Sequence, residues 1–256
     1  MHIIERNPAL TYPRDIQQEK RLIVLSWLLE FQFSSPRILA QLLEQPATST
    51  SRFFARMLEQ RFIRTFENVH TNRERLFMLD RTGIDFLMNH ELNVDNACTK
   101  PHVLHRYRFI LHDQAVQESV IHKMHGHTEV IWDKHITHID GDSRPDALMR
   151  MKKGYWVALD YERWRKSADR IYRMYHHHAQ AIEQERYHGV YLFFHSDQDR
   201  QYYQTLFDSE KWPVVSKNQT TGKLTHTKDD YYPDRIKNLR ATFLFEVLCC
   251  EGGKLT

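Results

Sequence analysis

Along the first ninety residues, apolar positions recur at helical spacing in three runs that short polar segments separate. These runs predict helices at 16–31, 36–43 and 48–60. Ser35 is placed to cap the second helix, and Pro36 suits its first position. Two strand-like segments follow at 62–66 and 75–79, joined by a polar tip, and an amphipathic helix begins near Gly83.

Three helices, a hairpin and a closing helix resemble a winged helix-turn-helix domain, which we expect over residues 1–95. The third helix would be the recognition helix and the hairpin the wing. Residues 46–81 hold seven arginines and four acids, and arginine binds phosphates bidentately and reads guanine edges. The residues expected to contact DNA are Ser49, Ser51, Arg52, Arg56, Arg73 and Arg75. The alternative is a protein-interaction domain whose charged face is simply solvated.

From about residue 102 the pattern changes, and a second domain is expected over 100–256. A helix is predicted at 107–124, a short strand at 129–132, and a hairpin of strands 147–151 and 155–161 with its turn at 152–154. A long helix at 167–185, a buried strand at 190–194 and a helix at 197–207 follow. The tail predicts a strand at 212–215, a polar loop at 216–234, and a strand or helix at 241–248.

Three carboxylates lie at the open end of the predicted hairpin. Asp146 stands before its first strand, and Asp160 and Glu162 end the second, on one face because side chains alternate with a period of two. Clustered carboxylates repel one another unless a cation lies between them, and oxygen ligands suit Mg²⁺ or Mn²⁺. The sequence therefore predicts a metal site formed by Asp146, Asp160 and Glu162. The alternative is a solvated edge balanced by neighbouring arginines.

The order helix, hairpin, helix, strand resembles the PD-(D/E)xK, or restriction-endonuclease-like, fold, so the expected class of the second domain is α+β or α/β. The matching residues are Glu118, Pro145, Asp146, Asp160 and Glu162. Glu162 stands where that fold has a lysine, which stabilises developing negative charge. Lys166 is the nearest substitute and Lys123 another. Asp113 is the alternative to Glu118.

The segments HDQAVQESV, RPDAL, VALDYER and YRMYHHHAQ together resemble the plasmid replication-relaxation family, and more narrowly the MobC-type relaxases of mobilisable plasmids. The resemblance spans roughly residues 15–200. It implies an enzyme that nicks one strand of plasmid DNA at an origin of transfer, with accessory mobilisation proteins and a coupling protein as partners. The catalytic residues expected on this basis are Asp146, Asp160, Glu162, Lys166 and Glu118.

The long helix carries further candidates. In this fold it flanks the active site, so His178, Tyr175 and Gln180 are expected as accessory residues. Tyrosines 161, 172 and 175 are candidate nucleophiles or base-stacking residues, or alternatively core aromatics. The three consecutive histidines 176–178 point 100° apart on a helix and cannot all face one ion.

A different relaxase chemistry, with a His-hydrophobic-His metal pair and a tyrosine nucleophile, is disfavoured. His125 and His127 flank a glycine, and nothing around Tyr12 indicates activation. Two other functions stay open. The missing motif lysine favours a non-enzymatic DNA-binding regulator, or a replication or mobilisation accessory protein, with a degenerate nuclease domain. A double-strand restriction endonuclease is a third possibility.

Bulk properties limit these hypotheses only loosely. The formal net charge of +3 over 256 residues means that a DNA-binding surface must be a local patch. No run approaches eighteen apolar residues and no signal peptide is recognisable, so we expect a cytoplasmic protein without membrane insertion. Cys98, Cys249 and Cys250 form no C-x-x-C pair, which favours a reducing compartment.

Overall fold

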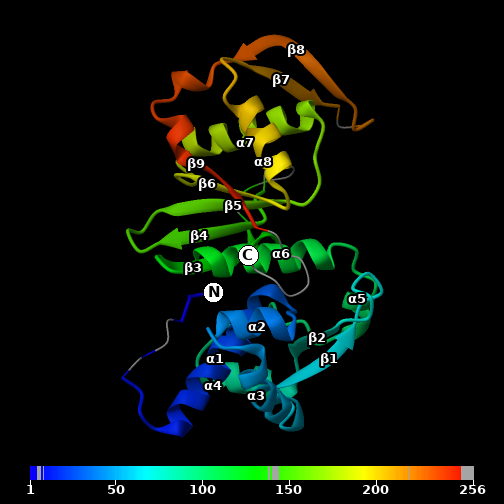
Figure 1. Ribbon diagram of the computed structural model, residues 1–256, viewed down its shortest axis with the longest axis vertical. Coiled ribbons are helices and arrows are strands. Elements are labelled where there is room, and N and C mark those ends of the chain that lie inside the picture. Colours follow the sequence, from blue (N-terminus) through cyan, green and yellow to red (C-terminus); the bar gives the residue numbers. More distant parts are fainter. Residues whose placement is uncertain (5–6, 8, 138, 140–143, 219, 249–256) are drawn as a thin grey trace. The chain divides into compact units, whose positions relative to one another are not determined.

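The computed structural model (Figure 1) describes residues 1–4, 7, 9–137, 139, 144–218 and 220–248; Cys249 and Cys250 lie outside them. The chain forms two compact units, Met1–Trp132 and Asp133–Thr256, each with helices and strands. This boundary differs from the one expected between residues 95 and 100. None of the described helices combines the length and the apolar character that a membrane crossing requires.

The first unit begins with the predicted order of elements. These are α1 (Pro13–Phe31), α2 (Pro36–Leu42), α3 (Ala47–Glu59), β1 (Ile63–Glu67), β2 (Arg75–Leu79) and α4 (Arg81–Asn89). The predicted cap is confirmed, since the Ser35 hydroxyl accepts a hydrogen bond from the Ile38 amide at 3.2 Å. The two strands pair antiparallel. Gly83 lies inside α4, where a Cβ atom would come within 2.1 Å of the Phe62 carbonyl oxygen, so only glycine permits this packing.

The remaining elements of the first unit are α5 (Pro101–His105), α6 (Ile110–Lys123) and β3 (His127–Trp132). Helix α6 buries polar side chains as well as apolar ones. The Gln117 side chain accepts a hydrogen bond from the Trp27 indole at 3.0 Å and donates one to the Phe33 carbonyl at 2.9 Å. Because buried polar groups need such partners, these bonds tie α6 to α1 and explain why the unit extends beyond residue 100.

The second unit contains a mixed sheet. Its elements are β4 (Ala147–Met151), β5 (Trp156–Glu162), α7 (Ala168–Glu183), β6 (Val190–Phe194), α8 (Asp197–Phe207), β7 (Trp212–Lys217), β8 (Leu224–Tyr231) and β9 (Phe243–Val247). Strands β4, β5, β6 and β9 are neighbours in that order, with β4 antiparallel to β5 and the next two pairs parallel. The predicted turn joins β4 to β5, and Gly154 adopts there a φ of 94° that favours glycine. Helix α8 contacts β6 and β9, and α7 packs beside it (Figure 1).

One expectation for the tail is corrected. The polar segment 216–234, expected as a loop, contains β8, which pairs antiparallel with β7. Its side chains are mostly exposed, so it lacks the apolar alternation that reveals a strand, although Tyr231 stacks on Trp212 at 5.4 Å. The last predicted segment, expected as a strand or a helix, is the strand β9. Short 3₁₀ segments occur at Asp133–His135, Pro233–Arg235 and Leu239–Thr242.

Candidate active site

The register of the β4–β5 hairpin brings Asp146 and Asp160 together, as the sequence predicts. Ala147 lies opposite Leu159, so the two aspartates face each other one residue further along. The Asp146 amide donates a hydrogen bond to Asp160 Oδ1 at 2.9 Å, and the Tyr161 amide donates one to Asp146 Oδ2 at 2.8 Å. Each carboxylate is therefore held by backbone of the opposite strand.

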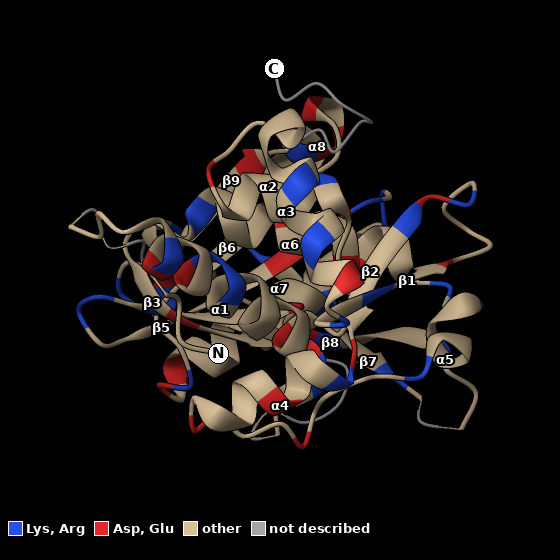
Figure 2. Cartoon of the chain, turned by 90° about the horizontal axis from the view of Figure 1, so that it is seen from below, with Lys and Arg blue, Asp and Glu red and all other residues tan. Residues whose placement is uncertain are grey.

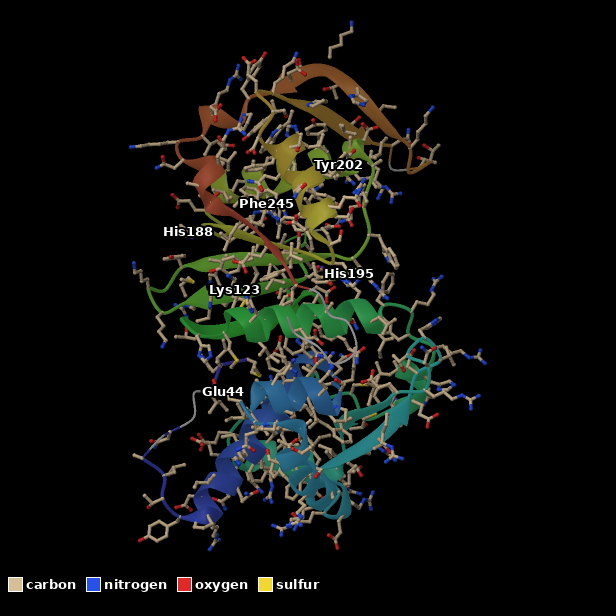
Figure 3. All side chains as sticks on the ribbon, viewed as in Figure 1. Glu44, Lys123, His188, His195, Tyr202 and Phe245 are labelled. Carbon is tan, nitrogen blue, oxygen red and sulfur yellow. The ribbon has the colours of Figure 1, made fainter. Side chains whose placement is uncertain are left out.

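Glu162 continues this face of β5 and is buried. Its Oε1 accepts a hydrogen bond from Lys166 Nζ at 2.5 Å, and its Oε2 accepts one from the Tyr203 hydroxyl at 3.2 Å. The same hydroxyl accepts a hydrogen bond from the Lys166 amide at 3.1 Å. Lys166, the predicted substitute for the motif lysine, thus lies at the carboxylates, whereas Lys123 (Figure 3) belongs to α6 of the first unit.

Opposing effects set the charges of this cluster. Burial lowers the pKa of Lys166, but the carboxylates of Glu162, Asp160 and Asp146 outweigh it and raise that pKa above the usual value. Burial raises the pKa of Glu162, with smaller contributions in the same direction from the two aspartates, and Lys166 only partly offsets this. The surrounding carboxylates therefore favour the protonated form of Lys166.

His178 holds the other oxygen of Asp160. Its Nε2 lies 2.8 Å from Asp160 Oδ2, and its Nδ1 lies 2.7 Å from the Tyr187 hydroxyl. Burial raises the pKa of Asp160, but the charge and hydrogen bond of His178 prevail, so the pKa is lowered overall. An ionised carboxylate only accepts hydrogen bonds, hence Nε2 carries a proton. His178 therefore lies beside the carboxylate of Asp160.

The other predicted residues of α7 lie elsewhere. Tyr175 is fully buried, its hydroxyl donates a hydrogen bond to the Tyr203 carbonyl at 2.7 Å, and burial raises its pKa well above the usual value. It is a core aromatic in this arrangement. Gln180 is exposed. His176 packs against Tyr231, with ring centroids 4.6 Å apart, so His176 and His178 contact different neighbours, as their helical spacing requires.

Three residues that contact this cluster were not predicted from the sequence. Tyr187 and Tyr203 carry no local signal, because only tertiary packing brings them to His178 and Glu162. Asp133 follows β3, and its amide donates a hydrogen bond to the Asp146 carbonyl at 2.9 Å. Burial raises the pKa of Asp133, and Asp146 raises it further. An acid directly after a predicted strand was the available signal for Asp133.

Tyr161 is also a core residue. Its side chain is 3% exposed, and its hydroxyl donates a hydrogen bond to the Leu248 carbonyl at 3.2 Å. The hydroxyl lies 3.3 Å from Nδ1 of His195 (Figure 3). Tyr172 is half-buried on α7. Tyr161 and Tyr175 therefore have the surroundings of core aromatic residues, the alternative to a nucleophile or a base-stacking residue.

The carboxylates of Asp146 and Asp160 are the candidate ligands for a divalent cation. Among the described residues, no group of three or more histidines, cysteines, aspartates or glutamates is arranged to hold a metal ion. Magnesium, however, is usually bound by one or two protein carboxylates together with water and phosphate oxygens. Asp146 and Asp160 offer such a pair, and their backbone hydrogen bonds leave lone pairs on each carboxylate. The donor types therefore fit Mg²⁺ or Mn²⁺, with Lys166 as a neighbouring cation.

Glu118 has its own cationic partner within the first unit. It is buried in α6 and forms an ion pair with Arg37 of α2. Its Oε1 accepts the Arg37 hydrogen bond, while its buried Oε2 has no hydrogen-bond partner in the described part of the chain. The predicted role of Glu118 beside the hairpin acids stays a prediction. Asp113, its alternative, is buried in the same helix.

The residues predicted to contact DNA lie on exposed positions of the first unit. Arg52 and Arg56 are exposed on α3, and Arg73 and Arg75 are exposed at the β1–β2 hairpin; basic residues are blue in Figure 2. The side chains of Ser49 and Ser51 donate hydrogen bonds to backbone carbonyls one turn earlier, at 2.8 and 3.0 Å. The serine hydroxyls can still accept hydrogen bonds, and the arginines are accessible to a phosphate.

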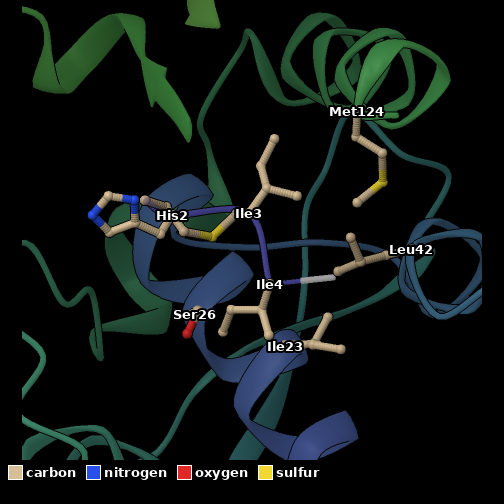
Figure 4. Close-up of a pocket in the computed structure, with 8 residues that line it drawn as sticks. His2, Ile3, Ile4, Ile23, Ser26, Leu42 and Met124 are labelled. Atoms are coloured by element: carbon tan, nitrogen blue, oxygen red, sulfur yellow. The ribbon is translucent and has the colours of Figure 1, made fainter. Parts of the chain in front are cut away.

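The first unit also contains two hollows, neither lined by a predicted site residue. The larger, of about 350 Å³, is lined by residues that include Glu30, His90 and Glu129. The smaller (Figure 4) lies among Ile3, Ile23 and neighbouring side chains and measures about 10 Å³. It has room for a single water molecule at most.

Comparison with known proteins gives no match, whether with family models, curated proteins or solved structures.

Proposed function

We propose that this chain is a metal-dependent DNA strand-nicking enzyme of the plasmid mobilisation type that its motifs resemble. One observation carries the proposal: the Asp146–Asp160 pair on the β4–β5 hairpin lies in a cluster with the ammonium of Lys166. Two carboxylates that can hold a metal ion, with a nearby lysine that stabilises negative charge, are suited to metal-assisted hydrolysis of a phosphodiester. Lys166 lies four positions after Glu162 and contacts it, and in this proposal it supplies the charge missing at the motif position.

Each side chain receives a role in this proposal. Asp146 and Asp160 would hold Mg²⁺ or Mn²⁺, which when bound supplies positive charge at the scissile phosphate and a more acidic water. Lys166 stabilises the negative charge that develops on the phosphate oxygens, since its raised pKa keeps it protonated. Glu162 positions that lysine, and His178 fixes the orientation of Asp160.

The first unit would place the enzyme on duplex DNA through the exposed arginines of α3 and of the β1–β2 hairpin. Phosphate contacts of this kind position a protein without reading sequence, and their strength falls as salt rises. The expected partners remain plasmid DNA at an origin of transfer, accessory mobilisation proteins and a coupling protein.

The test is nicking of supercoiled plasmid by the purified chain, with Mg²⁺, with Mn²⁺ and with EDTA. A metal-dependent rise of open-circular product is expected, and linear product would instead indicate a double-strand endonuclease. The matched variant is Asp146→Asn, which keeps an oxygen to accept the Tyr161 amide but removes the ligand charge. Nicking by this variant at the wild-type rate, or no nicking by the wild type with either metal, would overturn the proposal.

A specific observation favours a second function. Lys166 forms an ion pair with Glu162, and His178 lies within hydrogen-bond distance of Asp160, so both of these carboxylates have partners from the chain itself. A DNA-binding protein without enzymatic activity would have these properties. Binding of plasmid DNA without nicking, and without thermal stabilisation by Mg²⁺ or Mn²⁺, would support this alternative.

A further inference from the structure

The segment that follows Glu162 exposes a tryptophan. The Trp164 residue is 71% exposed, whereas Trp27, Trp132 and Trp212 are at most 1% exposed and Trp156 is half-buried. A buried indole stabilises a fold through its large apolar area. Trp164 makes no such contribution to this unit, so its exposed face is available to a ligand.

One cation lies over this indole, and further basic residues follow it in sequence. The Arg163 guanidinium lies over the Trp164 ring at 5.2 Å. The Arg165 side chain is fixed by a 2.7 Å contact with Asp199 and by stacking at 4.8 Å on Tyr202 (Figure 3). Residues 163–173 hold five basic side chains and one acid, and that acid, Asp169, pairs with His226. An exposed aromatic ring with a guanidinium over it, in a segment rich in basic residues, is complementary to a base and its phosphates.

The ends of the segment are anchored at the carboxylate cluster. Lys166 Nζ contacts Glu162 Oε1, and the Tyr203 hydroxyl bonds both to Glu162 and to the Lys166 backbone. These contacts join residues 162 and 166, with Trp164 midway between them. A group bound to the indole is therefore held within a few residues of the predicted catalytic side chains.

We propose that Trp164 stacks on an unpaired nucleobase beside the scissile phosphate, and that the protein thereby selects single-stranded or locally melted DNA. This rests on the proposed function for the identity of the reacting phosphate. Stacking needs an exposed base face, which a base inside a duplex does not offer. Trp164 is a specificity-determining residue in this view, and the carboxylates and Lys166 do the chemistry.

The experiment measures binding in EDTA, so that no cleavage occurs. A 12-nucleotide single strand, the matching duplex and the RNA strand of the same sequence are titrated into the full chain while tryptophan emission is recorded. Single-stranded DNA is expected to quench the emission more than the duplex does. The quenching should vanish in Trp164→Phe, because the other tryptophans are buried or half-buried.

Affinity is measured in parallel by anisotropy of the labelled strand. We expect roughly tenfold weaker binding for Trp164→Ala and near wild-type binding for Trp164→Phe, because a phenyl ring still stacks on a base. Phe109→Ala removes an aromatic residue of the first unit that is 60% exposed and serves as the matched control, with unchanged affinity expected. Equal affinity of Trp164→Ala and wild type, equal quenching by the duplex, or tighter binding of RNA than of DNA would each overturn the inference.

Failure of this inference is distinguishable from failure of the proposed function. If the wild type nicks plasmid but Trp164→Ala binds single strands normally, only the inference fails. If Trp164 governs binding but no metal supports nicking, only the proposed function fails.

Discussion

Glu118 and Glu162 are both buried and each pairs with one basic side chain, but their surroundings differ. In the first unit, the Glu118 side chain is 3% exposed and pairs with Arg37. In the second, the Glu162 side chain is 5% exposed and pairs with Lys166. Glu162 belongs to a group with Asp146 and Asp160 whose charges act on one another. Glu118 has buried amide and hydroxyl side chains beside it in α6.

This difference shows what a buried ion pair does and does not imply. Such a pair alone is weak evidence of either stability or function, because desolvation offsets most of the attraction. A group of like charges held close together is a stronger indication of a functional site. Their mutual repulsion disfavours the folded state, and such groups are found most often where a function needs them. The Arg37 pair therefore fits a structural role, and the Lys166 pair fits a chemical one.

The largest effect is expected from removing the two cations in turn. Lys166→Met should lower metal-dependent nicking by about 10²- to 10³-fold, because the developing phosphate charge loses its stabilising cation. Arg37→Met should leave nicking per folded molecule nearly unchanged but cost about 1–3 kcal/mol of stability, since it leaves a buried carboxylate without its partner. Plasmid nicking and urea unfolding of both variants measure this. A loss of activity in fully folded Arg37→Met would reverse the assignment.

A smaller effect is expected from neutralising the two glutamates. Glu162→Gln should reduce nicking by roughly 30-fold, because Lys166 keeps its charge but loses its anchor, and misplaced catalytic groups are costly. Glu118→Gln should change nicking less than twofold. Initial nicking rates at saturating Mg²⁺ separate the two, with circular dichroism as the folding control. Equal losses in both variants would show that Glu118 serves the same site, as the sequence motif predicts.

Tyr187→Phe tests whether the hydrogen bond between Tyr187 and His178 helps to hold Asp160 in place. The substitution leaves His178 Nδ1 without its 2.7 Å partner while the side-chain volume hardly changes. We expect nicking to fall about tenfold, through loss of the orientation of Asp160, and stability to fall by about 1–2 kcal/mol. The variant should need a higher Mg²⁺ concentration than the wild type to reach half of its maximal nicking rate. Unaltered Mg²⁺ dependence would mean that Tyr187 has only a structural role.

The smallest effect concerns acid stability. The pKa of Asp160 is lowered in the folded chain below its usual value of 3.8, so the ionised form stabilises the fold above that pH. This contribution disappears as pH falls through the lowered pKa. Wild type should therefore be more stable than Asp160→Asn near pH 6, and the two curves should converge below about pH 3.8. Urea unfolding between these limits gives the comparison, and a constant difference across the range would contradict the proposed pairing.

Much of the local structure was predictable because it depends on neighbours in sequence. Helical spacing located α1, α2, α3, α7 and α8, and the cap at Ser35 formed as its residue type requires. Asp146 and Asp160 lie opposite each other because the short turn fixes the register of the hairpin. They point to the same face because side chains alternate along a strand with a period of two. The strand β8 was missed, since its polar side chains form a strand only through pairing with β7.

The sequence by itself thus determined the elements, the opposition of Asp146 and Asp160, and the presence of a lysine close enough to replace the missing one. Only the tertiary structure decided which groups complete the cluster. Tyr187 and Tyr203 reach it from the loop after α7 and from α8, and no local periodicity encodes those contacts. The physical reason is that burial and hydrogen bonding between distant segments, and not the preferences of neighbouring residues, select these partners.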